Sequence, residues 1–231
     1  MTITFITGAN KGLGRETARR LIELGHTVVV GARDPERGAE AAAALGARFV
    51  PIDVTDDASV AAAAKNVAEH EGRIDVLINN AGITGPHRDA IDLTSADALS
   101  VFDVNLFGVI RATAVFVPLL RRSADPVIVN VSSGMGSLGV TTDADRLEST
   151  LTGLAYPSSK SALNMLTSQY AKAYPRFRIN AVDPGYTATD LNGHRGTKTA
   201  QQGAEIIVRM ATIGPAGPTR TFQDEDGVVP W

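Results

Sequence analysis

Tyr156 and Lys160 are four residues apart in the segment Y-P-S-S-K. On a helix, residues i and i+4 share a face, so the phenol and the ammonium would lie side by side. A nearby positive charge favours the phenolate and lowers the pKa of a tyrosine from its usual value near ~10. Such a tyrosine can donate a proton to a carbonyl oxygen or take one from an alcohol. Because ordinary solvated helices also carry this spacing, the pair gains its weight from the rest of the chain.

A glycine-rich turn near the N-terminus provides the second chemical signal. Residues 3–7 (I-T-F-I-T) are β-branched or aromatic and predict a strand. The next seven residues are G-A-N-K-G-L-G, and residues 15–24 have apolar side chains at helical spacing, with Gly25 as the expected end of the helix. Glycines let the backbone turn tightly beside a pyrophosphate, and the helix N-terminus offers free N–H groups. The segment therefore predicts a dinucleotide-binding turn with the spacing G-x-x-x-G-x-G.

Together these motifs resemble the classical short-chain dehydrogenase/reductase family, and the resemblance covers nearly the whole chain. Seven motifs occur in the order that the family shows. They are the cofactor turn Thr7–Gly14, the adenine-contacting pair Asp53–Val54, the N-N-A-G segment Asn79–Gly82, Asn105, the serines Ser132–Ser133, Tyr156 with Lys160, and Pro184–Gly185.

The resemblance implies four catalytic residues: Asn105, Ser133, Tyr156 and Lys160. The Ser133 hydroxyl would donate a hydrogen bond to the substrate oxygen, and Tyr156 would deliver the proton. Lys160 would lower the Tyr156 pKa and bind the nicotinamide ribose, while Asn105 would hold a water that links Lys160 to solvent. No metal is required. Side chains alternate along a strand, so only one of the two serines can face the cofactor, and we expect it to be Ser133.

The resemblance also implies a set of cofactor-binding residues, with the backbone at Thr187 on the carboxamide and the Thr189 hydroxyl near the pyrophosphate. The complete set is Thr7, Gly8, Asn10, Lys11, Gly12, Leu13, Gly14, Arg33, Asp53, Val54, Asn80, Ala81, Gly82, Tyr156, Lys160, Pro184, Gly185, Thr187 and Thr189.

The end of the second predicted strand indicates which cofactor is used. NAD-binding proteins of this kind place Asp or Glu there to accept from the ribose 2′-hydroxyl. Here Ala32 occupies that position, Arg33 follows it, and Lys11 is a second cation within reach. Asp34 comes one place too late. We therefore expect NADP(H), and net reduction in cells.

The chain alternates strands and helices, which predicts a parallel sheet covered on both faces. We expect one α/β, doubly wound Rossmann-type domain over residues 1–231, with six or seven strands. The expected strands are 3–7, 26–31, 48–54, 74–79, 127–132, 178–183 and 221–222. The expected helices are 15–24, 34–45, 56–70, 95–120 with a break near residue 103, 156–173 and 201–212.

Composition fits this fold and excludes other classes of site. Apolar residues make up 44% and charged residues 20% of 231, the net charge is −3, and there is no cysteine. The sequence has no block of basic residues, so it does not indicate a surface that binds nucleic acid. The four histidines are scattered and form no pair of metal ligands. The first strand begins by residue 3, so we expect no signal peptide. No apolar run approaches membrane-span length, so we expect a cytoplasmic protein without a membrane partner.

Two features bear on assembly and point in opposite directions. Ser133 precedes Tyr156 by 156 − 133 = 23 residues, more than in most classical members. The extra residues, within 134–155, resemble a shorter form of the insertion in monomeric carbonyl reductases, as does the final Pro230-Trp231. Against a monomer, residues 106–120 are apolar nearly all round, which favours burial against a partner chain. We expect a homodimer, with the monomer as the alternative.

Three functions are compatible with this sequence. An NADPH-dependent carbonyl reductase, acting on a small-molecule ketone, aldehyde or alcohol, fits all four catalytic positions. A nucleotide-sensing regulator without turnover would usually lack the tyrosine or lysine. An NAD-dependent epimerase or dehydratase would usually carry a larger C-terminal region than the 231 − 185 = 46 residues after Gly185. The substrate itself is not revealed, because its walls would be the loops 84–91, 134–155 and 186–201.

Overall fold

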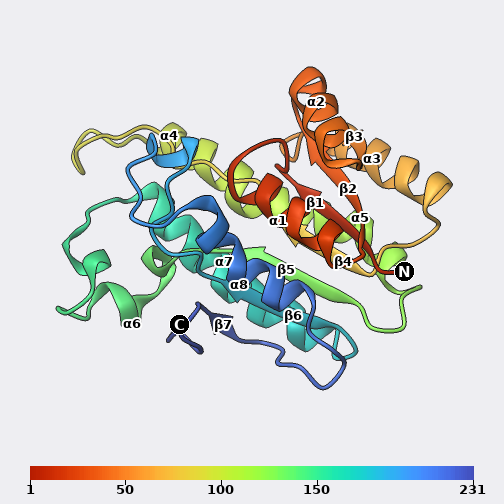
Figure 1. The fold of residues 1–231 in the computed structure, drawn as a ribbon. Helices are drawn as coiled ribbons and strands as arrows, with labels where there is room; N and C mark the ends of the chain where they lie inside the picture. The colour runs from red at the N-terminus through yellow and green to blue at the C-terminus, as the bar shows by residue number, and fades with distance from the viewer.

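Seven parallel strands form one sheet, in the order β3-β2-β1-β4-β5-β6-β7, in a computed structural model that describes residues 1–231 (Figure 1). The strands are β1 (Ile3–Thr7), β2 (Thr27–Ala32), β3 (Arg48–Pro51), β4 (Val76–Asn79), β5 (Val127–Val131), β6 (Arg178–Val182) and β7 (Phe222–Gln223). Every residue of β4 and β5 is buried, as expected for central strands of a sheet covered on both faces.

Helices cover both faces of this sheet (Figure 1). Helices α1, α2 and α8 pack on one face and α3, α5 and α7 on the other, each over its own apolar cluster. The helices are α1 (Gly12–Glu23), α2 (Pro35–Leu45), α3 (Asp57–His70), α4 (Ser95–Phe102), α5 (Gly108–Leu120), α6 (Leu138–Thr141), α7 (Ala155–Ala173) and α8 (Ala200–Ala211). The predicted doubly wound α/β fold is therefore confirmed.

The element ends follow from local chemistry. Asp34 accepts hydrogen bonds from the N–H groups of Glu36 and Arg37 and so caps α2, which ends at Gly46 in the left-handed conformation (φ 65°). The third strand is shorter than predicted: its last ladder hydrogen bond runs from the Ile52 N–H to the carbonyl of Ala32, where the neighbouring strand β2 ends.

The strand order reverses between β1 and β4, which lie side by side although they are not consecutive. Chain segments leaving the carboxyl ends of these two strands diverge, and a crevice at this point is where open α/β sheets bind ligands. The segment Gly8–Gly14 follows β1, and Asn80–Gly82 follows β4, so the fold brings both predicted cofactor segments to this point.

Helices α4 and α5 are joined by a π-helical turn, Asp103–Phe107, at the predicted break. The whole run Ser95–Leu120 has 26 residues and a mean hydropathy of 1.5 in its best window, so it is long and apolar enough to cross a membrane. The expectation that no apolar run reaches this length is therefore wrong. The run is nevertheless part of the core, because Phe116 lies 4.4 Å from Phe5 between ring centroids and Ala112 is fully buried.

The insertion between β5 and α7 is ordered around α6 and is attached to the C-terminal residues. The Ser137 hydroxyl donates to the Pro230 carbonyl at 2.6 Å, and the Trp231 ring stacks on Phe222 at 5.9 Å between centroids. The last residues of the chain thus hold one wall of the region around Tyr156.

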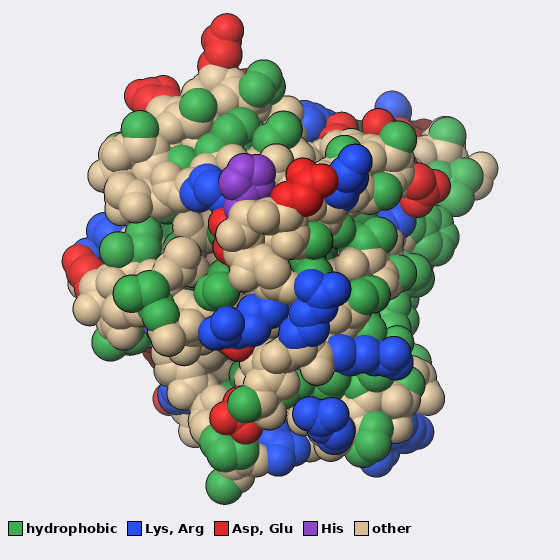
Figure 2. Space-filling view, turned by 90° about the vertical axis from the view of Figure 1, so that its right-hand side faces the viewer, with side chains coloured by type: hydrophobic (Ala, Val, Ile, Leu, Met, Phe, Trp, Pro, Cys, Tyr) green, Lys and Arg blue, Asp and Glu red, His purple; other side chains and the backbone are tan.

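The amino ends of the strands form the opposite side of the molecule, which faces the viewer in Figure 2. Lysine and arginine side chains gather there. Exposed cations also lie at the carboxyl ends of two helices, with Arg121 and Arg122 after α5 and Lys172 near the end of α7. Cations at these positions complement the negative ends of the helix dipoles. This accumulation of positive charge is therefore separate from the crevice.

Candidate functional site

The glycine turn after β1 is locked to the segment after β4. The Asn80 side-chain amide donates to the carbonyls of Thr7 and Gly8 at 2.9 and 3.0 Å, and the Thr7 hydroxyl accepts from the backbone of Asn80 and Ala81. Gly8 has φ +66°, and a Cβ there would lie 2.9 Å from the Ala81 Cα. The turn can therefore keep this path only with glycine.

The N-terminus of α1 offers free hydrogen-bond donors at this turn. Lys11 is the N-cap residue, and no side chain caps the helix. The first turn of α1 also contains no acidic residue. Uncapped N–H groups and the positive end of the helix dipole fit an anionic group such as a pyrophosphate. The predicted residues Asn10, Gly12, Leu13 and Gly14 surround this position.

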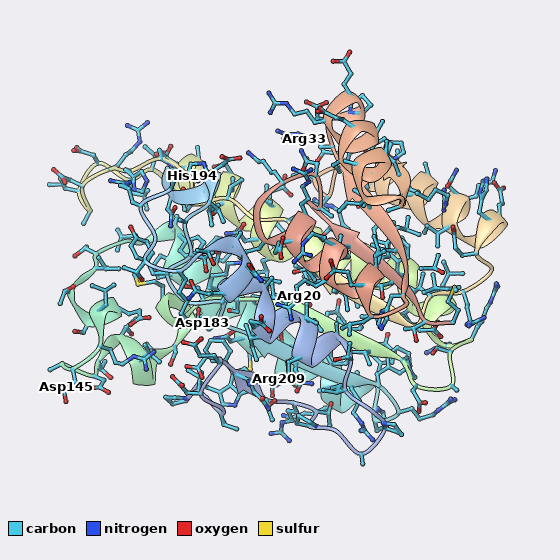
Figure 3. The ribbon with its side chains drawn as sticks, viewed as in Figure 1. Arg20, Arg33, Asp145, Asp183, His194 and Arg209 are labelled. Carbon is cyan, nitrogen blue, oxygen red and sulfur yellow. The ribbon has the colours of Figure 1, made fainter.

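Two cations near the turn differ in their surroundings. Arg33 is exposed and has no hydrogen-bond or ion-pair partner (Figure 3), while Asp34 is occupied in capping α2. Lys11 is held by Asp190, with Nζ 2.8 Å from Oδ2, and Asp190 also binds the His194 ring at 2.8 Å. Sequence reasoning missed Asp190, because nothing in the sequence shows that its loop folds back onto the glycine turn.

Asp53 and Val54 follow β3 on the adenine side of the crevice predicted for the cofactor. Burial acts to raise the Asp53 pKa, but hydrogen bonds from the Thr55 N–H and hydroxyl, with the charges of Arg33 and Arg111, lower it overall. Asp53 therefore stays ionised as a hydrogen-bond acceptor. Val54 is buried against Gly108 at the start of α5.

Tyr156 lies at the start of α7, and its side chain is close enough to Ser133 for the serine hydroxyl to influence the Tyr156 pKa. Burial raises the pKa of Tyr156 to about 12, the Ser133 hydroxyl lowers it in part, and the negative charge of Asp183 raises it further. The expectation of a lowered tyrosine pKa is therefore wrong for the protein chain alone. The sequence shows the neighbouring cation but not the loss of water around the phenol, which is the larger effect.

Lys160 is only 4% exposed, and its ammonium donates to the Val131 carbonyl at 2.8 Å. The nitrogen lies 5.7 Å from the centre of the Tyr156 ring, so the two side chains share a face as predicted. Burial lowers the pKa of Lys160 to about 8. The Lys160 ammonium therefore loses its proton at a lower pH than an exposed lysine does, although it is still mostly protonated at neutral pH.

Asn105 is fully buried in the π-helical turn between α4 and α5. Its side chain accepts from the Ile83 N–H at 2.9 Å and donates to the Ile83 carbonyl and to the Ser159 hydroxyl. A Cβ on Gly82 would lie 3.4 Å from the Asn105 Oδ1 and 3.7 Å from the Lys160 Nζ. Asn105 and Lys160 therefore flank the same glycine.

The two serines after β5 have different environments. Ser132 is buried, and its hydroxyl donates to the Asn164 Oδ1 at 2.6 Å on α7. Ser133 is partly exposed beside Tyr156. The structure thus places Ser133, and not Ser132, at the phenol.

The segment after β6 closes the crevice from the other side. Pro184 is buried and Gly185 has φ +72°. Thr187 and Thr189 are nearly buried, and Thr189 contacts the position that a Gly12 side chain would occupy, at 3.5 Å. Thr189 therefore lies next to the glycine turn, and the roles that the resemblance implied for Thr187 and Thr189 stay predictions. Asp183, directly before this segment, was not singled out from the sequence.

A surface hollow of about 590 Å³ borders Gly12, Arg15, Thr189 and Asp190. None of the four predicted catalytic residues lines it. The hollow therefore lies on the outer flank of the glycine turn.

The known proteins that this chain resembles are dehydrogenases and reductases. Residues 2–200 match the family described as short chain dehydrogenase. The short-chain dehydrogenase anuI of Penicillium roqueforti is 39% identical over 225 residues, which cover 92% of this chain and 89% of that protein. The (−)-isopiperitenone reductase of Mentha piperita is 33% identical, covering 96% and 95% of the two chains. The solved structure of NADPH-bound carbonyl reductase from chicken fatty liver superposes with a TM-score of 0.89 at 27% identity, covering 100% of both chains.

Proposed function

The chain is an oxidoreductase of the short-chain dehydrogenase/reductase family, and we propose that it reduces a ketone or aldehyde with NADPH. One observation carries this proposal: Tyr156 neighbours Ser133, with buried Lys160 on the same helix face as Tyr156. A phenol and a hydroxyl at one point can both bond to the oxygen of a carbonyl group. Bound there, NADPH would supply the hydride.

In the proposed mechanism the Ser133 hydroxyl donates to the carbonyl oxygen and holds it against Tyr156. The Tyr156 hydroxyl, which burial keeps protonated, gives its proton to that oxygen as negative charge develops. Lys160 positions the cofactor ribose and lies close enough to move a proton toward Tyr156 afterwards. Asn105, whose side chain is fixed by hydrogen bonds with the Ile83 backbone, would hold a water that links Lys160 to solvent.

The preference for NADPH rests on Arg33 and Ala32. Arg33 is exposed and unpaired at the end of β2, so its guanidinium is free to meet a 2′-phosphate. Ala32 leaves no carboxylate to repel that phosphate. The carbonyl reductase from chicken fatty liver, solved with NADPH, supports this choice.

The loops around Tyr156 favour an apolar substrate. Large hydrophobic side chains are exposed on all three of them, including Ile91, Leu151, Leu154, Tyr186 and Leu191. Apolar side chains gathered at the mouth of a site favour substrates with an extended apolar surface. We therefore propose a bulky, uncharged cyclic ketone, in line with a relative named isopiperitenone reductase.

The test is a panel of cyclic ketones, aldehydes and quinones incubated with enzyme and either NADPH or NADH, followed by loss of nicotinamide absorbance. We expect turnover with NADPH and cyclic ketones. Tight NADPH binding without turnover on any carbonyl would instead favour the nucleotide-sensing regulator.

A second copy of the chain is the proposed partner of the α4–α5 surface. Leu99, Phe107 and Ile110 are exposed there, and Met165 of α7 is 62% exposed. This apolar surface is continuous across helices that pack on one another, which suits a self-complementary contact. We therefore propose a homodimer over the monomer that the insertion suggested.

A further inference from the structure

A buried carboxylate at the edge of the site has no role in the proposed reaction. Asp183 is the first residue after β6, and it is only 4% exposed. Figure 3 labels Asp183, and the strand pairings place the segment after β5, which contains Ser133, on one side of it and the segment after β7, which contains Asp224, on the other. Burying an ionisable carboxyl is costly unless hydrogen bonds compensate it, so its partners indicate its purpose.

Those partners are the backbones of two different loops. The Asp183 Oδ1 accepts a hydrogen bond from the Gly185 N–H at 2.9 Å, and the Asp183 Oδ2 packs against the Gly134 backbone, 2.8 Å from where a Gly134 Cβ would lie. Gly134 directly follows Ser133 after β5. Gly185 begins the segment that leads to Thr187 after β6. One side chain therefore joins the serine loop to the loop that covers the glycine turn.

The close approach at Gly134 depends on the missing side chain. A Cβ on Gly134 would lie 2.8 Å from the Asp183 Oδ2 and 2.9 Å from the Glu148 Oε1. Real Cβ atoms do not occupy such distances, so alanine would push the loop and the carboxylate apart. Glu148 shares this corner, and its ion-pair partner is Arg146 of the same turn.

We propose that Asp183 is a positioning residue, whose carboxylate holds the Ser133 hydroxyl at a fixed distance from the Gly185–Thr187 backbone. This inference rests on the proposed function, in which Ser133 meets the substrate oxygen while the second loop meets the cofactor. Because a misplacement of about 1 Å between reacting groups can slow a reaction about a hundredfold, such a clamp would matter for rate.

The charge of Asp183 gives a second, electrostatic consequence. It disfavours the phenolate of Tyr156 and so raises the Tyr156 pKa. Burial raises the pKa of Asp183 itself, the backbone N–H groups of Gly185 and Gly134 lower it, and the charges of Glu148 and Asp224 raise it. Lys198, which contacts Gly185, is neutralised by Glu225 at 2.6 Å. Loss of the Asp183 charge should therefore lower the Tyr156 pKa.

The test compares Asp183→Asn with the matched control Glu148→Gln, which removes the other carboxylate at Gly134. An amide of the same size keeps one acceptor but turns an N–H donor toward a backbone N–H. In the enzyme without cofactor, we expect amide hydrogen exchange at both Gly134 and Gly185 to accelerate together in Asp183→Asn and not in Glu148→Gln. This readout does not depend on turnover.

In ketone reduction with NADPH, Asp183→Asn should lower kcat roughly tenfold to a hundredfold while the NADPH Kd changes by less than about threefold. The rise of alcohol oxidation with pH, which follows deprotonation of Tyr156, should move to lower pH, which a merely structural role would not produce. Gly134→Ala, which keeps the acid, should reproduce the loss of kcat and so covers the case of an unfolded Asp183→Asn.

Faster exchange at only one of the two amides, or equal loss of kcat in both carboxylate variants, would overturn the clamp. A wild-type enzyme that reduces no carbonyl compound would instead refute the proposed function, and the exchange result would still decide the role of Asp183.

Discussion

Replacing Arg33 with alanine should weaken NADPH binding selectively. Arg33 is exposed and unpaired, so its guanidinium gives up no existing ion pair when it meets the 2′-phosphate. Hydrogen bonds to charged groups contribute ~1.5–3 kcal/mol, and ~1.4 kcal/mol is tenfold in Kd. The NADPH Kd should therefore rise roughly tenfold to a hundredfold, while the NADH Kd stays nearly unchanged.

Lys11 should contribute less, because it must leave Asp190 first. An ion pair between half-exposed side chains is worth about 0.2–1 kcal/mol, which offsets part of what Lys11 gains from the phosphate. Lys11→Ala should thus have a smaller effect than Arg33→Ala. Asp190→Asn should tighten NADPH binding by up to about fivefold, since it frees Lys11 and removes a negative charge.

Calorimetric titration of both cofactors into wild type and these variants measures the effect, with Ala32→Asp as a reversal that should favour NADH. The reasoning fails if wild type binds NADH and NADPH equally, or if Arg33→Ala loses both cofactors alike. In either case the catalytic residues would keep their proposed roles.

Three further predictions concern catalysis, stability and assembly. Ser133→Ala should lower kcat about a hundredfold with the fold intact, whereas Ser132→Ala should mainly remove the hydrogen bond to Asn164 and lower stability by about 1 kcal/mol; kinetics and thermal melts separate the two, and the opposite pattern would reverse the assignment. Because burial lowers the pKa of Lys160 to about 8, the unfolded chain binds more protons above pH 8. Unfolding free energy should consequently rise with pH between about 8 and 10 by up to about 3 kcal/mol relative to Lys160→Met, and equal pH slopes would contradict the burial. Ile110→Glu should convert the dimer to a monomer in light scattering, and an unchanged mass would exclude this surface as the interface.

The motif-bearing parts of the structure could be predicted from the sequence because their chemistry is local. The glycine turn, the N-N-A-G segment and the Tyr156–Lys160 pair each occupy one strand end or one helix face. Alternation of strands and helices fixed the fold class, since parallel strands need helical crossovers. The alternation of side chains along a strand predicted that Ser132 and Ser133 have different environments, and the family resemblance favoured Ser133.

Properties that depend on burial or on distant segments could not be predicted. The raised Tyr156 pKa reflects lost solvation and the charge of Asp183, which approaches only when β6 pairs with β5. Asp190 reaches Lys11 only through the fold of its loop. The sequence predicts a helix over residues 95–120 with a break near residue 103, but its length and mean hydropathy reach those of a membrane span.

The internal structure of the insertion was also beyond the sequence. Its Gly, Thr, Asp and Ser content predicts a loop, yet α6 forms there because Ser137 caps it and bonds to Pro230, far along the chain. The similarity of Pro230-Trp231 to a family ending gave no indication that these residues pack against the insertion.

The central claim is that Tyr156 donates the proton in carbonyl reduction. Tyr156→Phe keeps the ring but removes the hydroxyl, so the NADPH Kd should change little. Single-turnover and steady-state reduction of the best cyclic ketone should then show kcat lowered by ~10²–10⁴, the range of general acid catalysis. A variant that kept more than about a tenth of the wild-type kcat, well outside that range, would contradict the account.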